Sequence, residues 1–182
     1  LNSFLSTILR TVDRIMIVKM LGVTYVGYYS IAIMTKGYLY GLSNNFYIVT
    51  IPHMQEMYGR EKKIEDIKKF VTVPAKTISY LLSPFLGLMF LVAPIFIKVC
   101  LPRYILGIVA LQILLLDTFF ESCCAQAGQF MITLGKQARL IPISLITITL
   151  NIFFNYIFVK AGLGIGGVAL GTALASFFSF VA

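Results

Sequence analysis

The chain has 182 residues, enough for one domain of ordinary size, but 59% of them are hydrophobic and only 12% are charged, whereas a soluble chain carries about 25% charged residues. This composition excludes an ordinary soluble domain, which could not hide so much apolar surface. The net charge of +8 does not indicate nucleic-acid binding, since no polar domain is present to carry a basic face. We therefore expect a membrane protein whose basic residues lie in loops and contact lipid headgroups.

Six segments contain the roughly 20 mostly apolar residues that a membrane-spanning helix needs. In chain order they cover about 1–21, 25–57, 70–99, 104–134, 140–159 and 165–182. Apolar runs such as 78–97 lack the polar–apolar alternation of a barrel strand, and a helix pairs its backbone groups within one segment. We predict an all-α membrane protein in which residues 1–182 form a single six-helix transmembrane lobe. Both ends fall inside helices, so we expect a fragment of a larger protein.

The first segment carries three charged residues, Arg10, Asp13 and Arg14. Arg14 lies about 12 Å before Gly22, which places it near the midplane of a hydrocarbon core about 30 Å thick. A charge at that depth is costly and is a functional candidate by default. Arg10 and Arg14 share one helix face, and Asp13 could neutralise one of them. The alternative is an internal salt bridge that only packs helices.

The second segment adds Lys36, which lies about 14 Å past Gly27. A short turn joins the first two segments, so Arg10, Arg14 and Lys36 are expected at one level with one acid nearby. An uncompensated positive cluster inside a membrane requires water or an anionic ligand. We predict that these three side chains form a binding site.

The loops indicate the orientation in the membrane, because basic residues favour the cytoplasmic side. Seven basic residues follow the second and fourth segments, against four on the opposite side: Arg60, Lys62, Lys63, Lys68, Lys69, Lys136 and Arg139 against Lys19, Lys98, Arg103 and Lys160. The first set should be cytoplasmic. Within it, residues 61–70 have one apolar face and fit either a short interfacial helix or a solvated helix extension.

The last three segments carry polar and small residues at helical spacing. Asp117 and Glu121 lie four residues apart and could carry protons, bind a cation, or pair with Lys36 or Lys76; we favour pairing. Asn151 and Asn155 share a face and are expected to form interhelical hydrogen bonds. Three small residues at a spacing of four predict close packing of the sixth helix within the lobe: Gly167, Gly171 and Ala175.

No enzyme constellation or cofactor motif is present in the sequence. The three cysteines, Cys100, Cys123 and Cys124, are odd in number and form no CxxC motif, so we expect neither a disulfide framework nor a metal site. The single histidine, His53, falls at a membrane edge. There is no P-loop, GxSxG or HExxH motif. We expect a protein that is not an enzyme and has no cofactor.

Several short motifs in this order resemble polysaccharide flippases of the multidrug/oligosaccharidyl-lipid/polysaccharide (MOP) exporter superfamily, which includes the MATE-type exporters. They lie at 13–17, 21–22, 26–32, 101–104, 135–137, 150–156 and 162–172. Members of that family have two six-helix lobes around a central cavity, and the order of motifs here resembles the C-terminal lobe.

The resemblance implies a transporter of the bacterial inner membrane that moves undecaprenyl-pyrophosphate-linked oligosaccharides by alternating access. Its partners would be membrane lipid, that substrate, the N-terminal lobe of the same chain and a possible coupling ion, Na⁺ or H⁺. Arg10, Arg14 and Lys36 would hold the pyrophosphate.

Two other functions fit the same sequence. An ion-coupled multidrug exporter of the same superfamily would have a cavity dominated by acids such as Asp117 and Glu121, so the sign of the cavity charge separates it from a flippase. A non-transporting membrane anchor or assembly subunit would pair all of its buried charges and line no cavity.

Overall fold

The computed structural model describes residues 2–59 and 64–181, which are helical apart from short turns and contain no strand. The six α-helices follow one another along the chain as α1 (Asn2–Met20), α2 (Val23–Gly59), α3 (Ile64–Cys100), α4 (Ile108–Thr133), α5 (Leu140–Lys160) and α6 (Gly164–Val181). Two short 3₁₀ turns, η1 (Pro102–Gly107) and η2 (Gln137–Arg139), precede α4 and α5.

Four helical segments of the described chain are long and apolar enough to cross a membrane: Lys76–Cys100, Pro102–Thr133, Gln137–Lys160 and Gly164–Val181. The protein is therefore an all-α, multi-pass membrane protein, and the predicted fold class is confirmed. The helices α1 and α2 are not among these four segments; α1 carries several charged residues, and tyrosines and glycines lower the hydropathy of α2. Both helices nevertheless pack against the apolar four.

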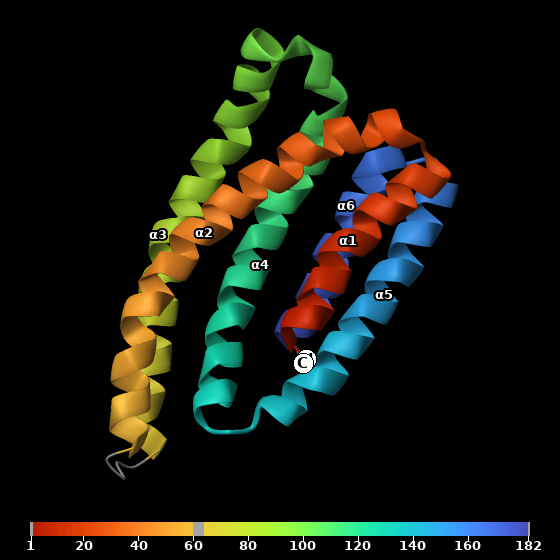
Figure 1. Ribbon diagram of the computed structural model, residues 1–182. Coiled ribbons are helices and arrows are strands. Elements are labelled where there is room, and N and C mark those ends of the chain that lie inside the picture. The colour runs from red at the N-terminus through yellow and green to blue at the C-terminus, as the bar shows by residue number, and fades with distance from the viewer. Residues whose placement is uncertain (1, 60–63, 182) are drawn as a thin grey trace.

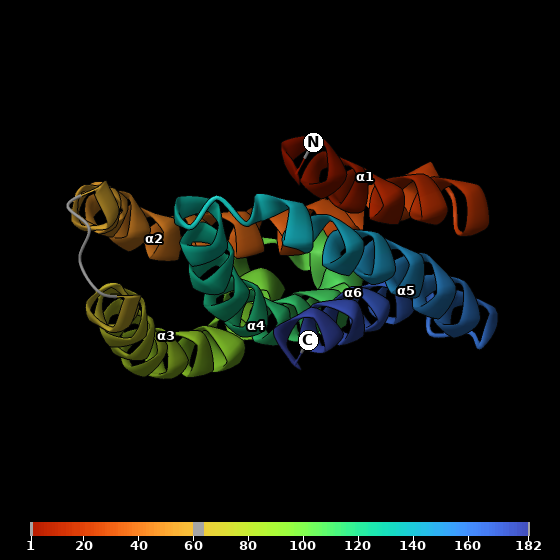
Figure 2. The ribbon, with the colours of Figure 1, turned by 90° about the horizontal axis from the view of Figure 1, so that it is seen from below.

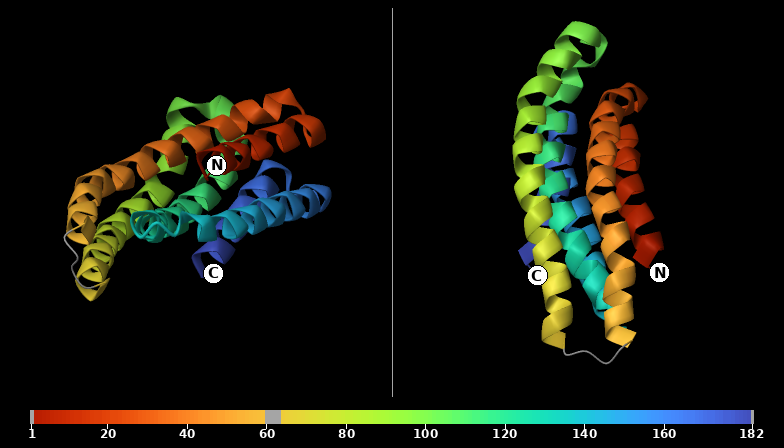
Figure 3. Two further views of the ribbon diagram at one scale, coloured as in Figure 1. Left: turned by 60° about the horizontal axis from the view of Figure 1, so that its bottom comes forward. Right: turned by 90° about the vertical axis from the view of Figure 1, so that its left-hand side faces the viewer.

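The helices form one bundle with α4 near its centre, packed against α2, α3 and α6 (Figure 1). On the other side α5 pairs with α6, and α1 lies along α5 (Figure 2). The C-terminal end of α2, the N-terminal end of α3 and the α4–α5 turn lie at one end of the bundle, and the α1–α2, α3–α4 and α5–α6 turns lie at the other (Figures 1 and 3). Of the basic residues that gave the orientation, Arg60, Lys62 and Lys63 lie outside the described residues, and the orientation stays a prediction.

Two helix starts differ from the sequence-based expectation. We expected the third span to begin near Phe70, with residues 61–70 as either a short interfacial helix or a solvated helix extension. The helix α3 begins at Ile64 and runs unbroken to Cys100, so the described part of that segment extends the helix; residues 60–63 lie outside the described chain. The fourth helix opens with the 3₁₀ turn η1, and its α-helical part begins only at Ile108. There Gly107 packs on α2 so closely that a Cβ would lie 2.5 Å from the Tyr28 carbonyl oxygen.

The small-residue stripe of α6 packs inside the bundle, as predicted. Gly167, Gly171 and Ala175 are buried, and α6 makes its closest approach to α5 along this face. A Cβ on Gly171 would lie 2.8 Å from the backbone nitrogen of Asn155. Only glycine allows this approach, which brings the polar side chains of α5 and α6 together.

Candidate functional site

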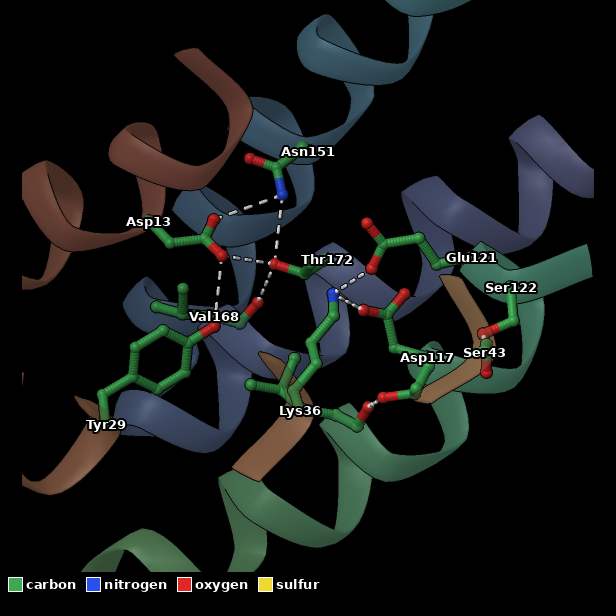
Figure 4. A network of polar contacts seen from close by, with 12 residues as sticks. Asp13, Tyr29, Lys36, Ser43, Asp117, Glu121, Ser122, Asn151, Val168 and Thr172 are labelled. Atoms are coloured by element: carbon green, nitrogen blue, oxygen red, sulfur yellow. Dashed lines mark hydrogen bonds and ion pairs between the residues drawn. The ribbon is translucent and has the colours of Figure 1, made fainter. Parts of the chain in front are cut away.

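One face of α2 carries three polar residues at intervals of seven, Tyr29, Lys36 and Ser43. Seven residues are about two helical turns, so the three side chains point the same way. The buried apolar residues Ala32 and Leu39 lie between them on that face. Each polar residue meets a partner on another helix, and α2 therefore presents a polar stripe to the interior of the bundle (Figure 4).

The first partner group, here named the Asp13 cluster, consists of Asp13, Tyr29, Asn151, Asn155 and Thr172. The Asp13 carboxylate is buried, with 6% of the residue exposed. Its Oδ1 accepts hydrogen bonds from the side-chain amides of Asn151 (3.3 Å) and Asn155 (2.9 Å). Its Oδ2 accepts from the hydroxyls of Thr172 (2.9 Å) and Tyr29 (3.1 Å). Four helices, α1, α2, α5 and α6, therefore meet at one carboxylate.

The partners of Asp13 are all neutral. In the described part of the chain no basic side chain forms an ion pair with it. A second oxygen, Asn155 Oδ1, is also buried and has no hydrogen-bond partner there. The cluster thus combines an uncompensated acid with a spare amide oxygen, and these are ligands that a proton or a small cation prefers.

The Thr172 hydroxyl lies between two acceptors, Asp13 Oδ2 at 2.9 Å and the Val168 carbonyl oxygen at 3.0 Å. A hydroxyl has one hydrogen and can donate to only one of them at a time. When Asp13 is ionised, Thr172 donates to it. When Asp13 carries a proton, Asp13 can donate to Thr172, which then donates to Val168. The cluster is therefore hydrogen-bonded in both protonation states.

The second partner group, the Lys36 triad, consists of Lys36, Asp117 and Glu121. The Lys36 ammonium is hydrogen-bonded to Asp117 Oδ2 and lies 2.8 Å from Glu121 Oε2. Asp117 is completely buried. The two acids stand four residues apart on α4, so one lysine reaches both. The triad joins α2 to α4, and the pairing that we favoured for these acids is the arrangement that the structure contains.

The third contact of the stripe is a hydroxyl pair. Ser122 Oγ on α4 donates to Ser43 Oγ at 3.3 Å. Both serines are buried, and Ser43 in turn donates to the Leu39 carbonyl oxygen at 3.5 Å. This contact extends the polar link between α2 and α4 beyond the triad.

The structure places two of the three predicted basic residues, Lys36 and Arg14, in different surroundings. Lys36 is engaged by two acids, whereas Arg14 is exposed. The side chain of Arg10 lies outside the described residues. Asp13, which could have neutralised one of the arginines, faces the interior and meets α2, α5 and α6. The reason is helix rotation: neighbouring residues on a helix point about 100° apart, so the buried Asp13 leaves Arg14 outside.

The expected interhelical role of Asn151 and Asn155 is confirmed, because both bridge from α5 to Asp13 on α1. Sequence reasoning missed Tyr29 and Thr172. The seven-residue spacing of Tyr29, Lys36 and Ser43 indicates that Tyr29 lies on the same helix face as Lys36. Thr172 lies next to Gly171 in the small-residue stripe, which hinted at a closely packed neighbour.

In the described chain no group of three or more acids, histidines or cysteines is arranged to hold a metal ion. The cysteines Cys100, Cys123 and Cys124 are free thiols. The side chain of His53 lies outside the described residues.

Comparison with known proteins gives one match. A family model described as "Polysaccharide biosynthesis protein" matches residues 1–110, more than half of the chain. No curated protein and no solved structure matches. The matched region covers α1 to η1, and so it includes Asp13, Tyr29 and Lys36.

Proposed function

We propose, from the premise that this chain belongs to the polysaccharide biosynthesis protein family matched by residues 1–110, that it is part of a flippase for lipid-linked oligosaccharides. Membership gives the chain a role in polysaccharide biosynthesis. The proposed substrate is an undecaprenyl-pyrophosphate-linked sugar unit, and the proposed location is the bacterial cytoplasmic membrane. The protein would act as a carrier rather than an enzyme, with this bundle and a second lobe rocking around a central site.

The observation that carries the proposal is the Asp13 cluster. An ionisable residue inside a membrane bundle is expensive and marks a transport pathway or proton relay far more often than a packing contact. A membrane anchor would pair such an acid with a base, but Asp13 is held by neutral amides and hydroxyls. We assign the coupling ion, Na⁺ or H⁺, to this cluster.

Occupancy of the cluster would change how firmly four helices are held together. An ionised Asp13 accepts hydrogen bonds from α2, α5 and α6. A proton or cation at the carboxylate replaces part of that bonding and alters the balance between two packings of α1 against its neighbours. A ligand shifts such a balance by as much as its affinities for the two packings differ, which is the requirement for coupled transport.

The headgroup contact is assigned to the exposed Arg14 rather than to Lys36. The planar guanidinium of arginine forms two parallel hydrogen bonds to a phosphate. Arg14 is exposed one residue from Asp13, whereas the Lys36 ammonium already contacts two carboxylates. The pyrophosphate site predicted from Arg10, Arg14 and Lys36 stays a prediction.

A second candidate is an ion-coupled exporter of cationic compounds. The observation in its favour is the charge balance of the two described clusters, which together contain one base, Lys36, and three acids, Asp13, Asp117 and Glu121. An exporter would expel a cationic dye from cells, and a flippase would not.

The test uses the full-length protein in cells that lack their own copy of the gene. Asp13→Asn keeps the shape and two hydrogen-bonding atoms but cannot be ionised. We expect cells with Asp13→Asn to lose surface polysaccharide and to accumulate the lipid-linked precursor, at a normal level of folded protein. The matched control is Thr149→Val on α5, whose exposed hydroxyl bonds only its own helix backbone at Leu145. Normal surface polysaccharide with Asp13→Asn would overturn the assignment.

A further inference from the structure

The Lys36 triad has more acid than it has base. When all three side chains are ionised, one ammonium faces two carboxylates, and one negative charge is in excess. Asp117 is completely buried, in a helix that lies at the centre of a membrane bundle. An excess charge in such a place is strongly unfavourable unless a further group neutralises it.

The hydroxyl groups nearby do not stabilise the second oxygen of the Asp117 carboxylate by hydrogen bonding. Thr118 donates to the Leu114 carbonyl oxygen at 2.7 Å, and Ser122 donates to Ser43. As a result Asp117 Oδ1 is buried without a hydrogen-bond partner in the described chain, while Oδ2 faces Lys36. If Asp117 is ionised, Oδ1 in this position loses its hydrogen bonds to water and gains no hydrogen bond from the described chain.

We propose that the Lys36 triad is a binding site for one exchangeable proton, held by the carboxyl groups of Asp117 and Glu121. A hydronium ion delivers the proton and leaves as water, one O–H bond forms, and one carboxylate becomes a carboxylic acid. The remaining carboxylate and Lys36 form a neutral ion pair. The triad as a whole then carries no net charge.

The geometry points to a proton rather than a metal ion. The Lys36 ammonium already occupies the position between the two carboxylates that a cation would take, and it would repel one. A metal ion also needs several oxygen ligands around it, whereas a proton needs one. The described chain offers no third acid, histidine or cysteine to complete a metal site there.

Two of the three side chains of the triad are partly exposed. The side chains of Glu121 and Lys36 are 30% and 18% exposed, whereas that of Asp117 is not exposed at all. Glu121 therefore forms the entrance, and the proton is passed inward along two carboxyl groups that share one lysine.

The other titratable groups around the triad come from every neighbouring helix. On α2 the only one in the interior stripe besides Lys36 is Tyr29, which is bonded to Asp13. On α4 itself, Cys124 interacts electrostatically with both acids. Asp13 on α1 interacts electrostatically with Lys36, Lys76 on α3 is exposed, and α6 has no charged residue. None of these supplies a second base.

Infrared spectroscopy of the purified full-length protein in lipid vesicles tests the proposal without any substrate. The probe is the C=O stretching band of a protonated carboxylic acid, measured across a pH titration for wild type, Asp117→Asn and Glu121→Gln. Asp13 is present in all three proteins, so its contribution cancels. We expect wild type to show one more protonated carboxyl group per molecule than either variant, because removing either acid leaves Lys36 with a single partner and no excess charge.

Thr149→Val serves as the control and should match wild type. If one variant does not fold, the other decides alone. An equal band in wild type and both variants would overturn the proposal. So would a band that persists in Glu121→Gln, because the proton would then belong to a buried Asp117 regardless of the charge excess. Neither result bears on whether the protein flips a lipid-linked substrate.

Discussion

The two buried polar groups on α2 keep carboxylates inside a membrane bundle in different ways. The Asp13 cluster surrounds one acid with neutral donors from three other helices. The Lys36 triad, about two turns further along α2, holds two acids with one base. Neutral donors satisfy hydrogen bonding but leave the charge of Asp13 free to be neutralised by an exchanging ion. In the triad, Lys36 forms ion pairs with both acids and so holds α2 against α4.

The largest expected effect comes from removing the base of the triad. Lys36→Met leaves the buried Asp117 and the partly exposed Glu121 without a cation, and breaking a buried pair in this way costs about 3–5 kcal/mol. We expect the full-length variant to unfold at a clearly lower temperature than wild type in detergent. Replacing both acids as well, with Asp117→Asn and Glu121→Gln, should restore most of the loss.

The matched control for this prediction is Lys98→Met, since Lys98 is exposed near the end of α3. If Lys36→Met were as stable as Lys98→Met, the triad would not hold α2 and α4 together, and its contrast with the Asp13 cluster would disappear.

A smaller effect is expected from crowding the Asp13 cluster. In Gly171→Ala the new Cβ would lie 2.8 Å from the Asn155 backbone nitrogen, and overpacking of this kind costs about 1–3 kcal/mol. Asn155 must then shift away from Asp13. We therefore expect a modest loss of thermal stability together with a larger loss of transport.

Gly37→Ala is the comparison for this change, because a Cβ at Gly37 meets nothing within 4 Å. It should be as stable as wild type or more so. Full transport by Gly171→Ala would show that the α5–α6 approach does not position the cluster.

The sequence predicted the fold class well and the site only in part. Long apolar runs mark the helices from α3 to α6 clearly, because lipid requires each span to be apolar along its length. The interhelical role of Asn151 and Asn155 was also readable, since a buried amide in a membrane requires a partner.

The contacts of Asp13 and Lys36 could not be derived in the same way. Whether Asp13 or Arg14 faces the interior depends on the rotation of α1, and a helix with charges on adjoining faces does not fix that rotation locally. Lys36 and Asp117 are 81 residues apart, so their pairing depends on how α2 packs on α4. Local periodicity placed the charges within helices but could not choose their partners.

The central claim is that this protein moves a lipid-linked oligosaccharide, coupled to an ion at Asp13. The most direct measurement reconstitutes the full-length protein in vesicles with an undecaprenyl-pyrophosphate-linked oligosaccharide in one leaflet, and follows its arrival in the other under a Na⁺ or H⁺ gradient. We predict movement well above that in protein-free vesicles, acceleration by one of the two gradients, and loss of both in Asp13→Asn. Movement no faster than in protein-free vesicles, or unchanged movement by Asp13→Asn, would contradict the account.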